Sequence, residues 1–223
     1  MRVAVFGATG RVGTLVVQAL LTRGHEAVGV SRSTPSRQHH GKYLSRVGDM
    51  TNPTFIQSVM ADCDALIFCI GQRLQSEKNL FSKNLSPPDI RTQIMNPIMR
   101  VIGSDHTKRF VYLSAFGVGA DLNKHALLFR MVLRLSSLGA SYEDHNKAES
   151  VLRASRTNWT IVRPPGLTDK DEVVPLSDAR GKWTSFMTVS RKSLAAFLVQ
   201  TLEDANLDRQ TLTVVANTRA MPA

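Results

Sequence analysis

The chain has 223 residues, of which 43% are hydrophobic and 21% charged, a composition typical of an ordinary globular protein. It contains no run of about 18 apolar residues, which excludes a transmembrane helix, and its first residues follow a strand pattern rather than that of a signal peptide. The only cysteines, Cys63 and Cys69, offer no disulfide framework. We therefore expect a reducing, cytoplasmic setting.

The chain is strongly basic, with 28 Lys and Arg residues against 18 Asp and Glu and a formal net charge of +10. Such a charge attracts phosphorylated ligands, nucleic acid or anionic membranes. The basic residues are spread along the chain, and neither a zinc-finger spacing nor the aromatic-basic motif of an RNA-binding module is present. We therefore expect no nucleic-acid partner.

Strand and helix patterns alternate from the first residues onward. Apolar runs and helical spacing predict strands at 2–6, 27–30, 43–47, 64–70, 109–114, 159–163 and 211–215, and helices at 11–23, 53–60, 87–104, 124–135, 141–155 and 190–203. This alternation predicts an α/β fold with a doubly wound parallel sheet of the Rossmann type. No internal repeat or linker divides the chain, so residues 1–223 are expected to form a single domain. We expect its substrate-side elements around 72–88, 116–140 and 164–189.

The segment GATGRVG (7–13) connects the first strand to the first helix, which is where a dinucleotide-binding fold needs a glycine loop. Gly7 permits a tight turn, Gly10 allows the backbone to approach a pyrophosphate, and Gly13 allows the helix to pack on the strand. Free N–H groups at the helix start would face the phosphates, and Thr9 could add a hydroxyl donor. The predicted phosphate-binding residues therefore also include Arg11 and Val12. A glycine-rich turn without a ligand is the alternative.

The second strand is followed by Ser31 and Arg32, where a carboxylate would favour NAD by binding the ribose 2′-hydroxyl. Arg32, together with Arg37, can instead pair with a 2′-phosphate. The sequence therefore favours NADP(H), although Arg32 could be only a solvated loop residue. After the third strand, Asp49 and Met50 are predicted to contact the adenine ring, with helix capping near Thr51 as the alternative role of Asp49.

These features resemble the atypical short-chain dehydrogenase/reductase group, and within it the family of NADPH-dependent flavin reductases, also called biliverdin-IXβ reductases. The resemblance covers residue 1 to about 200. Its landmarks are GATGR (7–11), Arg32, GD (48–49), I-G-x-R (70–73), L-S-P (85–87), S-A-F (114–116), D-H (144–145), V-L-R-x-S (151–155) and P-P (164–165). It adds Ile70, Gly71 and Arg73 to the expected cofactor contacts.

The resemblance implies that Ser114 lies beside the nicotinamide and that His145 faces the same pocket. It also implies that Pro164 and Pro165 shape the carboxamide end of the cofactor site. The flavin reductases have a further histidine directly after the proline pair, where this chain has Gly166. This difference weakens any inference that the substrate is a tetrapyrrole.

Most short-chain dehydrogenases combine a serine with a Y-x-x-x-K pair. Tyr142 and Lys147 are five residues apart, so they do not repeat that spacing. If the helix is aligned on its V-L-R segment instead, His145 takes the lysine position and Ser141 the tyrosine position. An alcohol-forming carbonyl reductase is therefore not favoured.

Reduction of a flavin or a quinone requires fewer catalytic side chains, because NADPH supplies the hydride and the acceptor accommodates the electrons. Ser114 could then hydrogen-bond the nicotinamide or the acceptor, and His145 could donate a proton. Alternatively, His145 is a structural histidine paired with Asp144 or the backbone, and Ser114 caps its strand.

The helix expected at 124–135 carries Arg130 and Arg134 one turn apart on an otherwise apolar surface. It could pack into the core or a homodimer, cover a flat acceptor, or contact an anionic membrane surface; the protein could equally be a monomer.

We expect an NADPH-dependent oxidoreductase that reduces a flavin, a quinone or a similar aromatic acceptor. The alternative is a non-catalytic NADP(H) sensor of the NmrA-like type, which the missing Tyr/Lys pair favours. A nucleotide-sugar epimerase or dehydratase fits poorly, because little chain follows residue 164 to form a sugar-nucleotide domain.

Overall fold

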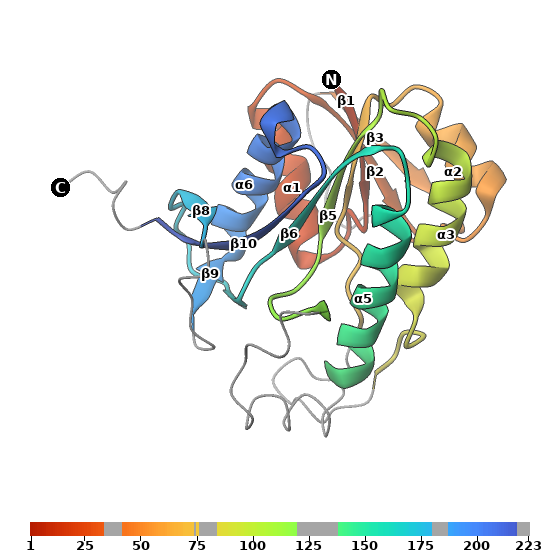
Figure 1. The fold of residues 1–223 in the computed structure, drawn as a ribbon. Helices are drawn as coiled ribbons and strands as arrows, with labels where there is room; N and C mark the ends of the chain where they lie inside the picture. Colours follow the sequence, from red (N-terminus) through yellow and green to blue (C-terminus); the bar gives the residue numbers. More distant parts are fainter. Residues whose placement is uncertain (34–41, 74, 76–83, 120–137, 180–186, 218–223) are drawn as a thin grey trace.

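The structure is a computed structural model that describes most of the chain. The described residues are 1–33, 42–73, 75, 84–119, 138–179 and 187–217. They form an α/β domain around a twisted central sheet (Figure 1).

The central sheet has eight strands in the order β3-β2-β1-β4-β5-β6-β10-β8. Only the pairing of β8 with β10 is antiparallel. The strands are β1 (Arg2–Phe6), β2 (Glu26–Ser31), β3 (Tyr43–Val47), β4 (Ala65–Phe68), β5 (Arg109–Leu113), β6 (Asn158–Arg163), β8 (Leu176–Asp178) and β10 (Gln210–Ala216). The predicted fold class, a Rossmann-type doubly wound sheet in one domain, is confirmed.

Helices cover both faces of this sheet, which makes three layers (Figure 1). The helix α1 packs beside α6 on one face, while α2, α3 and α5 lie on the other. Their bounds are α1 (Arg11–Thr22), α2 (Pro53–Met60), α3 (Ile90–Ile102), α5 (Leu138–Arg153) and α6 (Arg191–Glu203), and a 3-10 turn, η2 (Ala205–Leu207), precedes β10.

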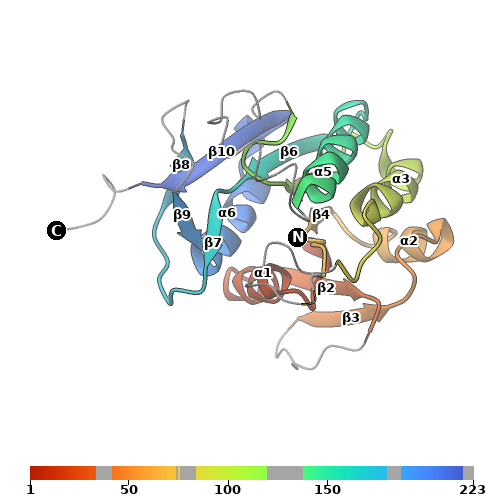
Figure 2. The same cartoon turned by 90° about the horizontal axis from the view of Figure 1, so that it is seen from below.

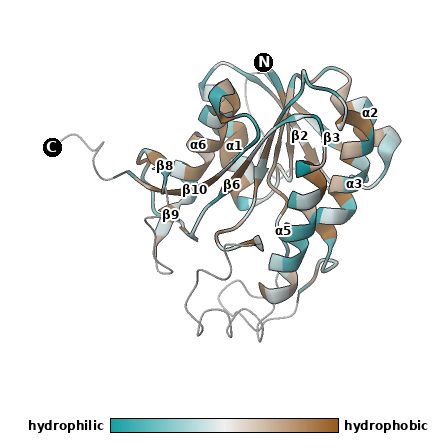
Figure 3. Cartoon of the chain, in the orientation of Figure 1, coloured by the Kyte–Doolittle hydropathy of each residue, from teal (hydrophilic) through white to brown (hydrophobic). Residues whose placement is uncertain are grey.

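The central strands lack polar alternation because both of their faces are buried. In β1, Val3 and Val5 belong to the core beneath α1 and α6, whereas Ala4 and Phe6 belong to the core beneath α2, α3 and α5. Figure 3 shows hydrophobic residues along the central strands and many hydrophilic residues along α5. The strand β3 is mostly exposed because it is an edge strand.

Several boundaries differ from the prediction. The helix α3 begins at Ile90 rather than at the proline pair 87–88, and α5 begins at Leu138 rather than 141. A stretch without a predicted element contains β7 (Gly166–Thr168) and β9 (Thr188–Ser190), which pair with each other, and β8. Strands of three residues are too short to show a periodic pattern. The helix predicted at 124–135 lies outside the described residues.

The carboxyl ends of the parallel strands all meet at one edge of the sheet (Figure 2). The chain leaves β1 towards β2 on one side and leaves β4 towards β5 on the other. Between β1 and β4 the strand order therefore reverses direction, and at such a point open α/β sheets bind their ligands.

Candidate cofactor and active site

The glycine loop lies at this reversal point, and two of its glycines are required by its geometry. Gly7 has a φ of +87°, and a Cβ at this position would lie 3.0 Å from the carbonyl oxygen of Cys69. A Cβ on Gly13 would lie 2.1 Å from the carbonyl oxygen of Gly7. The start of α1 can therefore approach β1 only because both residues lack a side chain.

The N-cap residue of α1 is Gly10, and no side chain caps the helix there. The N–H groups of a first helical turn have no partner within the helix, and the helix dipole favours an anion at this end. The loop and helix therefore have the arrangement that binds a phosphate group in dinucleotide-binding folds.

The other predicted loop residues differ in their exposure. Thr9 is exposed, whereas Val12 is buried in the core. The Arg11 side chain pairs with the carboxylate of Asp169, which also accepts a 2.8 Å bond from Arg191 at the start of α6. Two arginines at the starts of neighbouring helices thus converge on one carboxylate.

The ends of β2 and β3 lie next to the loop, on the side away from β4. Arg32 is exposed, and the buried Ser31 hydroxyl donates a 2.6 Å hydrogen bond to the carbonyl oxygen of Ser33. No carboxylate is present at these three positions. Arg37, the second residue predicted to bind a 2′-phosphate, lies outside the described residues.

Asp49 and Met50, the predicted adenine contacts, both have partners within the protein. Asp49 accepts hydrogen bonds from the backbone N–H and hydroxyl of Thr51, which hold the pKa of this carboxyl below its usual range. Met50 is 5% exposed and belongs to the core. The cap of α2 is Asn52, which accepts from Thr54 N–H.

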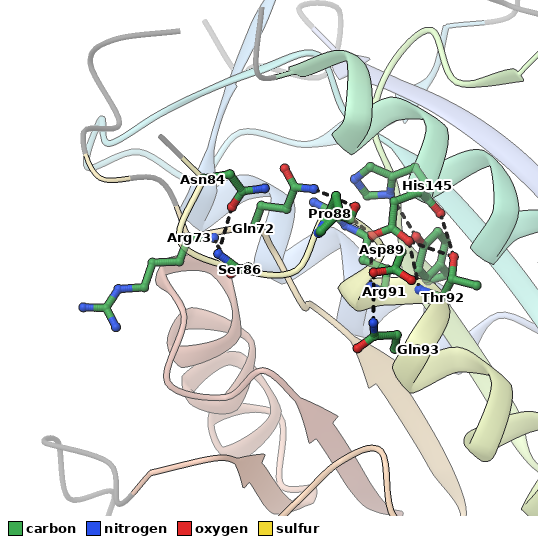
Figure 4. Close-up of polar contacts among 12 residues, drawn as sticks. Gln72, Arg73, Asn84, Ser86, Pro88, Asp89, Arg91, Thr92, Gln93 and His145 are labelled. Carbon is green, nitrogen blue, oxygen red and sulfur yellow. Dashed lines mark hydrogen bonds and ion pairs between the residues drawn. The ribbon is translucent and has the colours of Figure 1, made fainter. Parts of the chain in front are cut away.

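The segment that follows β4 is held by hydrogen bonds to residues 84–88 (Figure 4). The amide of Gln72 donates to the carbonyl oxygen of Pro88, and the N–H of Arg73 donates to the Ser86 hydroxyl. The Arg73 side chain is exposed and extends away from the other labelled residues, whereas Ile70 packs partly against the core and Gly71 is exposed.

Ser114 directly follows β5 and is only 4% exposed. Its hydroxyl donates a 2.6 Å hydrogen bond to Glu149 of α5, a carboxylate that also binds the guanidinium of Arg163 at 2.6 and 3.0 Å. Directly after Arg163, the buried Pro164 accepts a hydrogen bond from Phe116 N–H, and Pro165 is half-buried. Ser114 is thus joined to α5 and to the end of β6.

His145 is buried one turn before Glu149, and its Nδ1 lies 2.8 Å from the hydroxyl of Tyr112. Burial lowers the pKa of His145 well below its usual value, and the positive charges of Arg91 and Arg163 lower it further. The imidazole is therefore neutral at pH 7. Its expected role as a proton donor stays a prediction, and its partner is Tyr112 rather than Asp144.

Asp144 instead connects α5 to the start of α3. Its carboxylate accepts from the backbone N–H and side chain of Arg91, and from the backbone N–H and hydroxyl of Thr92. It therefore caps α3 from a different helix, while Asp89 at the N-cap position makes no capping bond.

The Tyr/Lys pair of most short-chain dehydrogenases is not reproduced by Tyr142 and Lys147. The Lys147 side chain is 57% exposed and pairs with Glu143 at 3.6 Å, so it points to solvent. Tyr142 is half-buried, and burial raises its pKa to about 12. Ser114 is hydrogen-bonded to Glu149, and His145 is hydrogen-bonded to Tyr112.

The topology brings most of the predicted site residues to one edge of the sheet, because they follow the parallel strands β1, β2, β3, β4, β5 and β6. No sequence pattern above indicates four further residues that contact this site: Glu149, Arg163, Tyr112 and Arg91. A signal for one of them was available, since Glu149 lies four residues after His145 and therefore on the same helix face.

The buried His145 predicts a pH dependence of stability. Because its pKa is lowered in the folded state, the unfolded chain binds the extra proton below about pH 6.5, so stability present at pH 7 is lost as pH falls. We expect the free energy of unfolding of the wild type, relative to His145→Gln, to fall by up to about 1.4 kcal/mol per pH unit between pH 6.5 and 5. Urea unfolding measures this difference.

The matched control is His106→Gln, because His106 is exposed and its Nδ1 contacts the backbone carbonyl oxygen of Arg156. It separates the loss of the buried imidazole from the general effect of replacing a histidine by glutamine. A flat difference between the wild type and His145→Gln over pH 5 to 7 would contradict a neutral, buried His145.

A protein-family model described as NAD(P)H-binding matches residues 7–205, which is most of the chain. The match begins at the glycine loop and runs to just beyond the end of α6, so it leaves out only the first and last strands of the sheet, β1 and β10. The chain belongs to the NAD(P)H-binding family.

Curated relatives of this NAD(P)H-binding protein match only in part. An uncharacterised protein of Mycobacterium tuberculosis is 34% identical over 74 residues, which are 33% of this chain and 8% of that protein. The 40 kDa subunit of mitochondrial NADH-ubiquinone oxidoreductase from Neurospora crassa is 25% identical over 166 residues, 72% of this chain and 39% of the subunit. The chain thus spans less than half the length of these relatives.

Solved structures share the fold of this NAD(P)H-binding protein along its whole length. A short-chain dehydrogenase/reductase from Veillonella parvula, in complex with NADP, has a TM-score of 0.74 at 16% identity, covering 97% of this chain and 95% of its own. ChuY, an anaerobillin reductase from Escherichia coli O157:H7, has a TM-score of 0.71 at 16% identity, and the match covers 100% of both chains.

Among the described residues, no helix is long and apolar enough to span a bilayer.

Proposed function

We propose that this NAD(P)H-binding protein is a reductase that uses NADPH to reduce a flavin, a quinone or a similar aromatic acceptor. The observation that carries the proposal is the uncapped start of α1 at the reversal point of the sheet, with Ser114 and the end of β6 at the same edge. When bound, the cofactor supplies the hydride. The side chains of the protein hold the cofactor and the acceptor in line and exclude water.

The fit of a dinucleotide is supported by the loop itself. A side chain on Gly7 or Gly13 would collide with backbone atoms, so these glycines allow the loop and the start of α1 to pack closely against the strand ends. The first turn of α1 would hold the pyrophosphate, and Ser114 and the 164–165 segment would face the nicotinamide half of the cofactor.

A preference for NADPH over NADH is supported by Arg32, which is exposed directly after β2 and is flanked in sequence by Ser31 and Ser33 rather than by a carboxylate. We expect Arg32→Gln to lower the ratio of NADPH to NADH affinity by about tenfold to a hundredfold, because a charge-assisted bond to the 2′-phosphate is lost. Calorimetric titration of both cofactors measures the ratio. Arg100→Gln is the control, since Arg100 is exposed near the distant carboxyl end of α3. An unchanged affinity ratio in Arg32→Gln would show that Arg32 does not determine the preference for NADPH.

An aromatic acceptor is supported by the absence of the Tyr/Lys pair at Tyr142 and Lys147, because reduction to an alcohol requires a proton donor beside the carbonyl oxygen. An anaerobillin reductase among the solved structures of this fold is compatible with this class of substrate. The test is NADPH oxidation by the purified protein with FMN and with a quinone. If the protein oxidises NADPH no faster than buffer alone with either FMN or the quinone, a reductase of flavins and quinones is excluded.

The same missing pair favours a second candidate, an NADP(H) sensor without turnover. In that case NADPH would bind tightly, no acceptor would oxidise it, and a protein partner would be retained in one redox state of the cofactor only. If the partner bound equally well to the NADPH-loaded and the NADP⁺-loaded protein, the sensor would be contradicted.

A further inference from the structure

The Glu149 side chain of α5 is buried and is bonded to Arg163 at the end of β6. It is 2% exposed, and both of its oxygens accept hydrogen bonds from arginines. Arg163 donates at 3.0 and 2.6 Å and Arg153 donates at 3.3 Å. Guanidinium groups only donate, so the carboxylate acts as the hydrogen-bond acceptor in all three contacts.

Ser114 donates its hydroxyl proton to this carboxylate at 2.6 Å, a short charge-assisted bond. A hydroxyl has one proton and two lone pairs. Because the proton is directed at Glu149, the side of Ser114 that faces a ligand presents lone pairs. A ligand group bound there has to be a hydrogen-bond donor.

We propose that Glu149 is a positioning residue that makes Ser114 a hydrogen-bond acceptor, so that this site selects a ligand N–H rather than a carbonyl oxygen. This proposal rests on the proposed function. Two ligand groups have the required chemistry, namely the carboxamide N–H of the nicotinamide and the imide N–H of a flavin-like acceptor. A plain aldehyde or ketone would find no proton at Ser114 to stabilise its developing oxyanion.

The experiment compares ligands that differ in one N–H. In the first arm NADPH is compared with its 3-acetylpyridine analogue, which has a methyl ketone in place of the carboxamide. In the second arm FMN is compared with N3-methyl-FMN. We expect the wild type to prefer the N–H-bearing ligand by about fivefold or more in one arm, in affinity or in kcat/KM, which is the size of one hydrogen bond. The arm that responds identifies the group that Ser114 holds.

Variants then connect this preference to Ser114 and Glu149. Ser114→Ala should bring the preference to about one, because the acceptor oxygen is gone. Glu149→Gln should weaken it in the wild-type background and change nothing further in the Ser114→Ala background. Glu143→Gln, an exposed glutamate of the same helix, should leave the preference at its wild-type value. If Glu149→Gln does not fold, the ligand pairs on the wild type and Ser114→Ala still decide the polarity of the serine.

Preferences near one in both arms of the wild type, or a preference that persists in Ser114→Ala, would overturn the proposal. So would equal effects of Glu149→Gln with and without Ser114. If no acceptor is reduced, the first arm is measured as binding affinity, which separates failure of the reductase from failure of this inference. If NADPH and its analogue both fail to bind, the two proposals fall together.

Discussion

Gly13→Ala is expected to abolish measurable NADPH binding and to lower the free energy of unfolding by about 1–3 kcal/mol, the usual cost of forcing an extra methyl group into a packed site. The added Cβ would lie 2.1 Å from the carbonyl oxygen of Gly7 and 3.0 Å from the Cα of Ala8. Both neighbours are backbone atoms, so no side chain can rotate away. The start of α1 would have to move off β1 and carry the anion-binding N–H groups with it.

Calorimetric titration with NADPH and urea unfolding measure the two effects of Gly13→Ala. Gln18→Ala is the matched control, because Gln18 is exposed on the same helix and alanine is well tolerated there. It should bind NADPH like the wild type. Wild-type affinity in Gly13→Ala would show that the phosphates of the cofactor are bound elsewhere.

Asp144→Ala is expected to lower the free energy of unfolding by about 3–5 kcal/mol, because removing one partner leaves the other buried and unpaired. The carboxylate is 1% exposed, and Arg91, its ion-pair partner at 3.2 Å, is 5% exposed. The same substitution also uncaps α3 at the N–H groups of Arg91 and Thr92. An asparagine side chain keeps one acceptor oxygen, so Asp144→Asn should lower the free energy of unfolding less than Asp144→Ala.

Urea unfolding of Asp144→Ala is best compared with that of Asp89→Ala. Asp89 occupies the N-cap position of α3, but it is exposed, and within the described part of the chain its side chain accepts from Gln93 and makes no capping bond. We expect a change within about 0.5 kcal/mol for Asp89→Ala, as for most surface positions. Equal losses in the two variants would mean that Asp144 does not cap α3.

Short elements and contacts between distant residues were not predictable from the pattern. The strands β7, β8 and β9 have three residues each, too few for a period to appear. Asp144 is adjacent to His145 in sequence and is therefore a candidate partner for it, but adjacent residues on a helix point about 100° apart. In the fold, Asp144 faces α3 and His145 faces Tyr112 of β5.

The doubly wound sheet and the position of the glycine loop follow from local patterns: apolar runs for strands, helical spacing for helices, and glycines between the first strand and the first helix. The chemical surroundings of Ser114 and His145 depend instead on contacts between distant parts of the chain. Glu149, Arg163 and Tyr112 come from three different elements, and only their packing brings them to these two residues. The direction of the Ser114 proton and the neutrality of His145 depend on burial and on charges distant in sequence, which no local pattern records.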